Sequence, residues 1–268
     1  MQPMLNIALR AARSAGELIF RSIERLDTAS VEDKEALDYV TNVENMAEQL
    51  IVQALQKTYP EHSFLGKTGG LIEDRTKKSE YVWIINSLDG TINFLHGMPH
   101  FAISISCKHR NRLEHAIILD PIRQEEFTAT RGRGASLNGH RLRVSKRKNL
   151  DGALLGSSLP FSVNQPEQFN QYFDMFRSLN DKKINIRQTG VTSLDLAYVA
   201  AGRYDAFCDR KLSEWDTLAG TLLIQEAGGL ISDFQGGHSF LENGSVIASN
   251  PKCLKAILTT IQPFVSKK

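Results

Sequence analysis

The first apolar residues of the chain recur at steps of three and four, the spacing of one face of an α-helix. They are Met4, Leu5, Ala8, Ala11, Ala12, Ala15, Leu18 and Ile19. A polar stretch from Asp27 to Asp38 follows, and a second helix is expected to begin at Thr41 or Asn42 and to end before Pro60. The residues expected on its inner face are Met46, Leu50, Ile51, Ala54 and Leu55.

The pattern then changes from helical to strand-like. Residues 81–85 form a continuous apolar run, which predicts a buried strand. Residues 101–108 alternate between larger apolar and smaller or polar side chains, the period of a strand with two different faces. Residues 115–119 and 126–130 continue the series, and Asn138-Gly139 is the strongest hairpin signal in the chain.

After about residue 150 strands and helices alternate. The expected strands lie at 154–157, 205–208, 230–234 and 246–248, and the expected helices at 166–179, 191–202, 215–227 and 251–261. This order predicts a layered α/β (α+β) fold in two halves, 1–150 and 151–268.

Composition excludes several classes of protein. Hydrophobic residues make up 41% and charged residues 23% of 268 residues, as in a globular protein with a sizeable core. No apolar run approaches the ~20 residues of a membrane span, and no secretion signal precedes the first helix. The three cysteines are far apart, which favours buried thiols over a disulfide framework. We therefore expect a cytoplasmic protein, and the net charge of +2 does not by itself indicate a nucleic-acid binder.

Two acidic segments are candidates for chemistry. The predicted strand at 81–85 leads into Asp89-Gly90-Thr91, where a rigid strand end can present a carboxylate and a hydroxyl to a ligand. The alternative is an ordinary Asp-Gly turn. Asp216 lies where a helix should begin, so it could simply cap that helix.

Together these segments resemble a known family. D-G-T-I-N-F at 89–94, W-D-T-L-A-G at 215–220 and E-A-G-G at 226–229 are similar to motifs of the inositol monophosphatases, Mg²⁺-dependent phosphatases. The resemblance extends to D-Y-V-T-N-V at 38–43, Asp120-Pro121, G-R-G-A at 132–135 and Gly236-Gly237. Segments 4–8, 99–102 and 195–203 are most similar to its bacterial SuhB branch.

The resemblance implies a layered αβαβα sandwich, a homodimer and a cage of carboxylates around Mg²⁺. Asp89 and Asp216 match two of the four metal-ligand positions. A third is occupied by Asn86, a weaker neutral ligand, and the position of the metal-ligand glutamate is occupied by Lys67. Catalytic cations neutralise developing charge and activate the attacking water, so two lost carboxylates predict weak or absent Mg²⁺ binding.

Other positions carry family roles as well. Thr91 and Glu44, the latter in place of an aspartate, match the pair that orients the attacking water. Gly90, Thr91, Gly190 and Asp209 match substrate-binding positions. If Lys67 points inward it can pair with Asp89 where the metal would lie, and if it points to solvent the site keeps more of its function.

Two functions follow from the resemblance. The first is a SuhB-like protein with weak or lost phosphatase activity that acts by binding partners in transcription antitermination, such as Nus factors or RNA polymerase. The second is an active Mg²⁺-dependent phosphatase that hydrolyses inositol 1-phosphate and other small phosphate monoesters. Between Arg131 and Lys148 there are seven Lys or Arg residues and no acid, which indicates either a solvated hairpin rim or a patch for an acidic partner or a nucleic acid.

Overall fold

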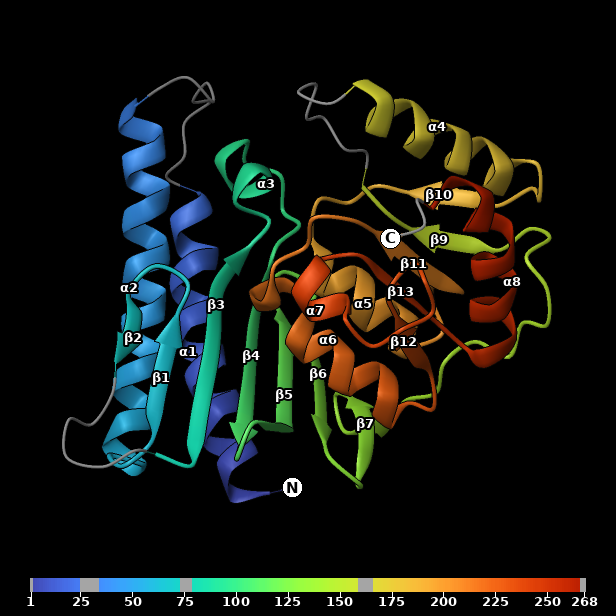
Figure 1. The fold of residues 1–268 in the computed structure, drawn as a ribbon. Helices are drawn as coiled ribbons and strands as arrows, with labels where there is room; N and C mark the ends of the chain where they lie inside the picture. Colours follow the sequence, from blue (N-terminus) through green and yellow to red (C-terminus); the bar gives the residue numbers. More distant parts are fainter. Residues whose placement is uncertain (1, 25–33, 73–78, 159–165, 266–268) are drawn as a thin grey trace.

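The computed structural model describes residues 2–24, 34–72, 79–158 and 166–265. They form five layers, in which helices, a large sheet, helices, a small sheet and helices follow one another (Figure 1). The predicted αβαβα sandwich is therefore confirmed. Each sheet lies between two helical layers, so its strands are covered on both faces.

The first half of the chain supplies one outer helical layer and the large sheet. Its elements are α1 (Pro3–Ile23), α2 (Lys34–Thr58), β1 (Ser63–Gly66), β2 (Gly70–Ile72), β3 (Tyr81–Asp89), α3 (Thr91–Leu95), β4 (Ala102–His109), β5 (Arg112–Asp120), β6 (Glu125–Thr130), β7 (Gly134–Leu137) and β8 (His140–Arg141). The sheet order is β2-β1-β3-β4-β5-β6-β7-β8. Only the β1–β3 pair is parallel within this sheet, as far as the described residues extend.

The second half supplies the central helices, the small sheet and the other outer helical layer. Its elements are β9 (Leu154–Gly156), α4 (Pro166–Asn180), β10 (Asn185–Arg187), α5 (Thr192–Ala200), β11 (Ala206–Asp209), α6 (Glu214–Glu226), β12 (Leu230–Ser232), α7 (Phe240–Asn243), β13 (Val246–Ser249), α8 (Pro251–Ile261) and the 3₁₀ turn η1 (Gln262–Phe264). The small sheet has the order β10-β9-β11-β13-β12. The division predicted near residue 150 falls between β8 and β9 and stays a prediction.

The alternation along β4 explains how the large sheet accepts helices on both faces. Ile103, Ile105 and Cys107 belong to the apolar cluster that α1 and α2 cover. Ala102, on the opposite face, belongs to the cluster formed with α5 and α6. All of these residues are buried. The face of β4 that carries the smaller side chains is therefore packed against helices and is not exposed to solvent.

The second helix differs from its prediction at two points. It begins at Lys34, because its inner face continues back into the stretch from Asp27 to Asp38 that was expected to be polar. The part of that stretch before residue 34 lies outside the described residues. The buried face consists of Ala36, Val40, Val43, Ala47, Ile51 and Leu55. Met46 and Leu50 are 53% and 38% exposed, so their predicted inward orientation is wrong. Helical phase sets the buried face, and both residues are out of phase with Ile51 and Leu55.

The other elements largely match the sequence pattern. Asn138 and Gly139, both with positive φ, turn the chain between β7 and β8 as predicted. The short elements β1, β2, β10, α3 and α7 were not anticipated, because three to five residues give too little periodicity.

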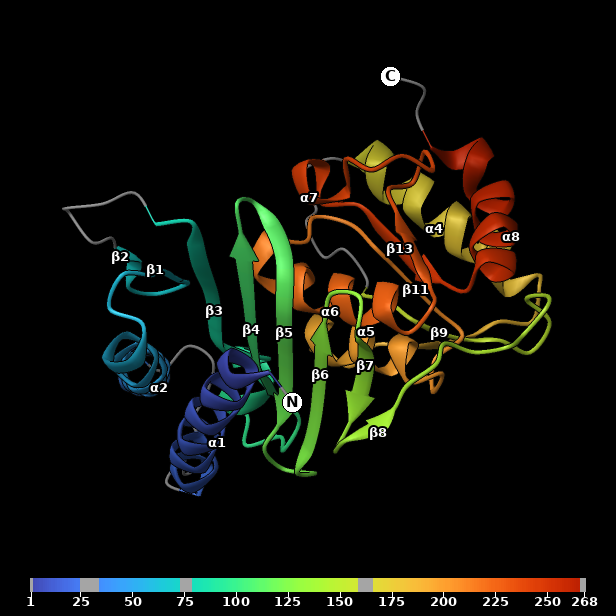
Figure 2. The same cartoon turned by 90° about the horizontal axis from the view of Figure 1, so that it is seen from below.

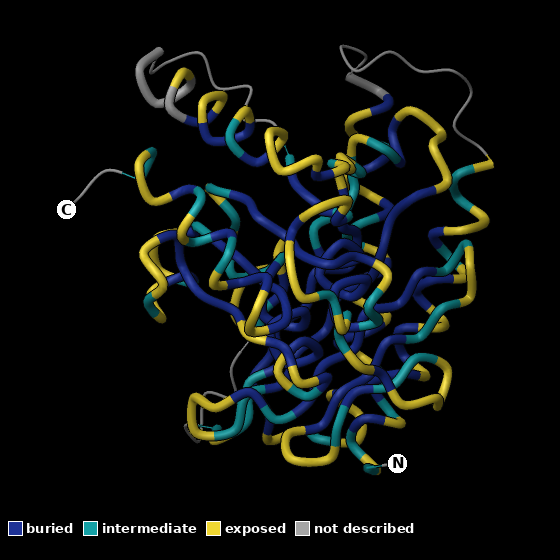
Figure 3. The backbone as a smooth tube through the Cα atoms, turned by 90° about the vertical axis from the view of Figure 1, so that its right-hand side faces the viewer, coloured by how far each residue is buried: buried dark blue, intermediate teal, exposed yellow. Residues whose placement is uncertain are grey.

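Three apolar clusters fill the spaces between the layers. Figure 3 shows the buried stretches running through the interior of the molecule, with exposed stretches at the loops and outer helix faces. All three cysteines are buried and unpaired, in agreement with the expectation of reduced thiols. In the described part of the chain, no helix combines the length and the apolar character needed to cross a membrane.

Candidate functional site

A tight turn at the end of β3 carries Asp89 and Thr91. Gly90 has a φ of +95°, and α3 begins directly after it. A Cβ atom at this position would lie 2.8 Å from Cγ2 of Val191, so both the backbone conformation and the space require glycine. The turn therefore places a carboxylate at the strand end and a hydroxyl at the helix start.

Asp89 is held at the N-terminus of α5. Its Oδ2 accepts hydrogen bonds from the Ser193 backbone N–H (2.8 Å) and the Ser193 hydroxyl (2.6 Å). Burial, followed by the negative charge of Asp216, raises the pKa of Asp89 to about 6, while Ser193 and the positive charge of Lys67 act in the opposite direction. Asp89 and Asp216, which the sequence predicted to share a site, are thus close enough to interact electrostatically.

Asn86 joins β3 directly to α6. Its Nδ2 donates a hydrogen bond to Asp216 Oδ1 (3.1 Å), and Asp216 Oδ2 accepts one from the Ser213 hydroxyl (2.6 Å). Asn86 is 1% exposed, and its Oδ1 has no hydrogen-bond partner among the described residues. The amide therefore turns its donor toward the acid and leaves its oxygen unsatisfied.

Glu44 and Thr91 also meet, as predicted for the pair that would orient a water. The Thr91 hydroxyl donates to Glu44 Oε1 (3.2 Å) across the space between α3 and α2. Burial raises the pKa of Glu44, whereas the charge of Lys67 and the hydrogen bond from Thr91 lower it. The catalytic role of the pair stays a prediction.

Lys67 lies in the turn between β1 and β2 and is exposed. Its charge lowers the pKa of both Asp89 and Glu44, so it acts on the site electrostatically. Within the described ranges, no carboxylate lies close enough to Lys67 to form an ion pair. The direct pairing with Asp89 considered from the sequence is therefore not formed.

Glu48, which sequence reasoning missed, holds the turn that carries Lys67. The carboxylate accepts hydrogen bonds from the backbone N–H groups of Thr68 (3.0 Å) and Gly69 (2.7 Å), and the side chain is buried. A Cβ on Gly66 would lie 2.0 Å from Glu48 Oε1, so glycine is required for this close approach. The available signal was the acid pair Glu44 and Glu48, which share one helix face at a spacing of four.

Gly190 lies beside α3, next to the turn of Asp89 and Thr91. A Cβ at Gly190 would be 3.4 Å from Oδ1 of Asn93, whose amide nitrogen donates to the carbonyls of Thr189 and His100 (both 2.9 Å). Asn93 thus fixes the loop before α5 against α3, and the predicted substrate position Gly190 is brought to the site.

Asp209 has a different environment from the other acids. Its Oδ2 accepts from the Ser158 hydroxyl (2.6 Å), and its Oδ1 accepts from Tyr172 (3.3 Å) and from the Arg210 backbone N–H (2.7 Å). The residue is 3% exposed, and burial raises its pKa to about 6. Both oxygens are already bonded within the protein, so its predicted substrate-binding role stays a prediction.

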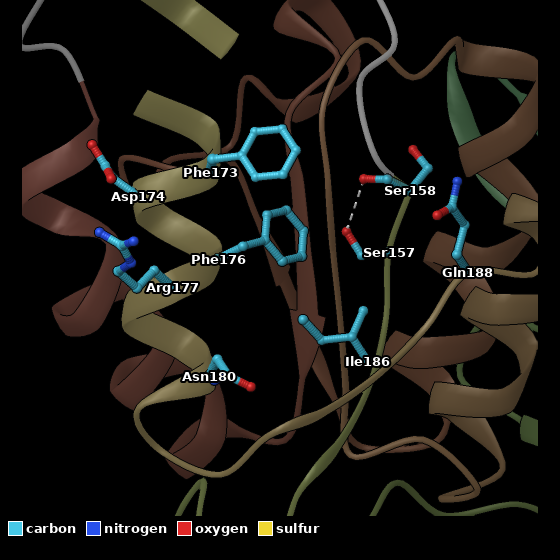
Figure 4. A pocket seen from close by; sticks show the side chains of 9 residues that line it. All are labelled: Ser157, Ser158, Phe173, Asp174, Phe176, Arg177, Asn180, Ile186 and Gln188. Carbon is cyan, nitrogen blue, oxygen red and sulfur yellow. Dashed lines mark hydrogen bonds between the residues drawn. The ribbon is translucent and has the colours of Figure 1, made fainter. Parts of the chain in front are cut away.

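A cavity of about 590 Å³ lies beside Asp209, between α4 and the β9–β10 edge of the small sheet. Figure 4 shows Phe173 and Phe176 of α4 on one side of it and Ser158 and Gln188 on the other. Ser158, which also binds Asp209, connects this cavity with the buried acid.

The side chains at the metal positions form a poor donor set for Mg²⁺. Magnesium requires several oxygen ligands in an octahedron. Here Asn86 directs a nitrogen toward Asp216, and Lys67 adds a positive charge nearby. Among the residues that the structure describes, no three His, Cys, Asp or Glu side chains are grouped to hold a metal ion. Asp89 and Asp216 are thus the two carboxylates left at the four family positions, and the weakness of Mg²⁺ binding stays a prediction.

Comparison with known sequences gives matches over almost the whole chain. Residues 1–266 match the model of the inositol monophosphatase family. A Pseudomonas aeruginosa protein named Nus factor SuhB is 65% identical over 265 residues, covering 99% of this chain and 98% of the relative. The Escherichia coli K12 protein of the same name is 44% identical over 266 residues, with the same coverage.

Solved structures confirm the fold. The extragenic suppressor protein SuhB from Bartonella henselae superposes with a TM-score of 0.87 at 32% identity, over 98% of this chain and 100% of that one. The inositol monophosphatase (IMPase) of Thermotoga maritima superposes with a TM-score of 0.82 at 25% identity, over 98% of each chain.

Proposed function

The chain belongs to the inositol monophosphatase family, and from this premise we propose that it is a SuhB-like protein whose Mg²⁺-dependent phosphatase chemistry is weak or lost and whose main activity is partner binding. The observation that carries the proposal is the hydrogen bond from Asn86 to Asp216. Asn86 presents a hydrogen-bond donor to Asp216 at a position where the family carries a carboxylate, so one acidic ligand of the expected cage is lost.

Hydrolysis of a phosphate monoester needs charge neutralisation and an activated water. Bound Mg²⁺ would supply both, and Asp89 and Asp216 would be its remaining carboxylate ligands. We assign the orientation of that water to Thr91 and Glu44, and the hydrogen bond between the Thr91 hydroxyl and the Glu44 carboxylate supports this assignment. Without a tightly held cation, this pair orients a water but does not generate a strong nucleophile, so the rate falls by orders of magnitude.

Lys67 opposes metal binding further. Like charges repel, so the ammonium group of Lys67 would weaken the binding of a dication beside Asp89, by an amount that solvent screening reduces because Lys67 is exposed. The charge of Lys67 already acts on Asp89 and Glu44, and any cation beside these acids would experience it too. In the family this position carries a negatively charged ligand, so the substitution changes the sign of the interaction.

The proposed partners come from the names of the relatives. A protein that is 65% identical over nearly its full length is named Nus factor SuhB, and so is one that is 44% identical. We therefore propose that this chain binds a transcription elongation complex in the cytoplasm, as a homodimer, through RNA polymerase or other Nus factors. This role requires the fold and its surfaces and does not require turnover.

A second function has support of its own. The site still brings Asp89, Thr91, Glu44 and Asp216 together, and Asn86 Oδ1 remains free to serve as a neutral ligand. An active Mg²⁺-dependent phosphatase of small phosphate monoesters, with reduced metal affinity, is therefore the alternative.

Phosphate release from inositol 1-phosphate at millimolar Mg²⁺ separates the two functions. We expect turnover well below the usual range of about 1–1,000 s⁻¹. The double variant Lys67→Glu/Asn86→Asp should gain activity, whereas Lys57→Glu/Asn86→Asp, with the same charge change at an exposed lysine of α2, should not gain as much. Turnover of the native chain in the usual range would refute the loss of activity.

Partner binding needs a separate assay. The tagged chain, incubated with purified RNA polymerase elongation complex and Nus factors from the same organism, should migrate with the complex on gel filtration. Failure to associate in the presence and absence of the other Nus factors would refute the binding role, whatever the phosphatase assay shows.

A further inference from the structure

Five lysines from three separate segments line one hollow of about 660 Å³. Lys148 is the last residue of the basic stretch, Lys182 and Lys183 lie in the turn after α4, and Lys252 and Lys255 lie on α8. All five are exposed. This group of residues, here called the lysine hollow, lies where α8 covers the outer face of the small sheet.

The charge of the lysine hollow is largely uncompensated. Its acidic lining residues are Asp151 and Asp181, so five positive and two negative charges leave +3, compared with +2 for the whole chain. Over the ranges that the structure covers, none of the five lysines forms an ion pair. A concentration of positive charge greater than that of the entire molecule favours an anionic ligand.

The basic stretch extends this charge beyond the hollow. In Figure 2 the segment after β8 runs from the edge of the large sheet toward α8. Arg141 at the end of β8, and Arg143 and Lys146 after it, are exposed and precede Lys148 along the chain. Arg147 instead forms an ion pair with Asp205 (2.8 Å) and anchors the segment. Exposed positive residues therefore follow the chain from β8 to Lys148, beyond the residues that line the hollow.

The remaining lining residues indicate what kind of anion fits. Among the described residues no aromatic side chain lines the hollow, and the apolar lining residues are Leu150, which is buried, and Ala256. The hydroxyls of Thr259 and Thr260 already donate to helix carbonyls. An acidic protein partner would normally need an apolar or aromatic anchor site, which this lining does not provide.

We propose that the lysine hollow, together with Arg141, Arg143 and Lys146, binds the phosphodiester backbone of a nucleic-acid strand independently of its base sequence. Lysine ammonium groups act as mobile point charges that neutralise phosphates without a fixed geometry. Without aromatic side chains there is no platform for base stacking, so the contacts are to the backbone. This surface is separate from the residues around Asp89, and the proposal holds whether or not the phosphatase is active.

Fluorescence anisotropy tests the proposal on the full chain. The probes are labelled oligouridylate and oligodeoxythymidylate of about 12 nucleotides, and the KCl concentration is varied from about 50 to 200 mM. The variant Lys252→Gln/Lys255→Gln removes two charges from α8 where no described side-chain bond is lost. Each phosphate contact on a single strand contributes about 0.7 to the magnitude of the slope of log affinity against log salt. For the loss of two lysines we expect this magnitude to fall by about 1.4. We expect the affinity itself to fall about 10- to 30-fold near 0.1 M salt.

The matched control is Arg10→Gln/Lys57→Gln, which removes two exposed charges from α1 and α2 and should leave affinity and slope unchanged. A second variant, Lys148→Gln/Lys182→Gln, tests the other walls, and unchanged unfolding temperatures establish that each variant is folded. The proposal is supported if the native chain binds the two oligonucleotides equally, or prefers one of them, and both hollow variants lose this binding. It is overturned if the hollow variants bind like the control, or if a polyglutamate peptide of equal charge binds the hollow as tightly.

Discussion

The amide nitrogen of Asn86 lies 3.1 Å from Asp216 Oδ1 and donates a hydrogen bond to it. This bond connects β3 with the first turn of α6 directly through side chains of the protein. Asn86 is buried, so a carboxylate in its place would face Asp216 in a poorly solvated site. The native pair is therefore expected to be stable in the absence of metal.

The substitution Asn86→Asp tests this directly. It places a third carboxylate beside Asp216 and Asp89, and in EDTA we expect the free energy of unfolding to fall by about 2–4 kcal/mol because a buried charge is left uncompensated. Excess Mn²⁺ should restore much of the loss. Urea denaturation with EDTA or Mn²⁺ measures both effects.

Asn86→Ala is the control for that experiment. It removes the hydrogen bond without adding charge, so we expect a loss of about 1 kcal/mol that Mn²⁺ does not change. If Asn86→Asp is as stable as the native chain in EDTA, the amide is not needed to neutralise Asp216.

Glu48 should contribute strongly to stability. Glu48→Ala removes a buried carboxylate that accepts two backbone N–H groups, and we expect a loss of about 2–4 kcal/mol. Glu17→Ala, at an exposed acid of α1, should change the free energy of unfolding by less than about 0.5 kcal/mol. Urea denaturation of both variants gives the comparison, and similar values would show that Glu48 does not hold the turn.

Asp209 should make stability depend on pH. Burial raises its pKa from 3.8 to about 6, so the folded chain binds this proton more tightly than the unfolded chain. Its contribution is therefore greatest at acidic pH and is lost as the pH rises from about 4 to 6, by about 1–3 kcal/mol. Asp209→Asn lacks this titration. The free energy of unfolding of the native chain minus that of Asp209→Asn should fall between about pH 4 and 6 and be constant above pH 6. Parallel curves of the two proteins against pH would contradict the assignment.

Much of the fold could be predicted from periodicity. The faces of α1 and β4 and the turn at Asn138-Gly139 follow from local spacing alone. The inner face of α2 was misplaced at Met46 and Leu50 because their large side chains were given more weight than their phase relative to Ile51 and Leu55. The start of α2 was missed because Lys34, Glu35 and Asp38 interrupt the apolar pattern of the sequence there.

The candidate site was only partly accessible from the sequence. Motif resemblance placed Asp89, Thr91, Glu44 and Asp216 together, and the structure brings them close. Glu48 was missed because an acid at helical spacing normally lies on a solvated face, and its buried position depends on the turn that it binds. The orientation of the Asn86 amide depends on Asp216, which is far away in the sequence, so no local pattern predicts it.

The lysine hollow was predictable only in part. The basic stretch ending at Lys148 was evident, but Lys182 and Lys252 come from other segments that fold against it. Such a surface depends on the packing of α4 and α8 and has no signature in any single stretch of sequence.

Calorimetric titration with Mn²⁺ and Mg²⁺ tests the central claim most directly. For the native chain we predict no saturable binding at sub-millimolar concentration, and for Lys67→Glu/Asn86→Asp binding at least about tenfold tighter, equivalent to about 1.4 kcal/mol. Sub-millimolar binding by the native chain, unchanged by the two substitutions, would contradict a metal site closed by Asn86 and opposed by Lys67.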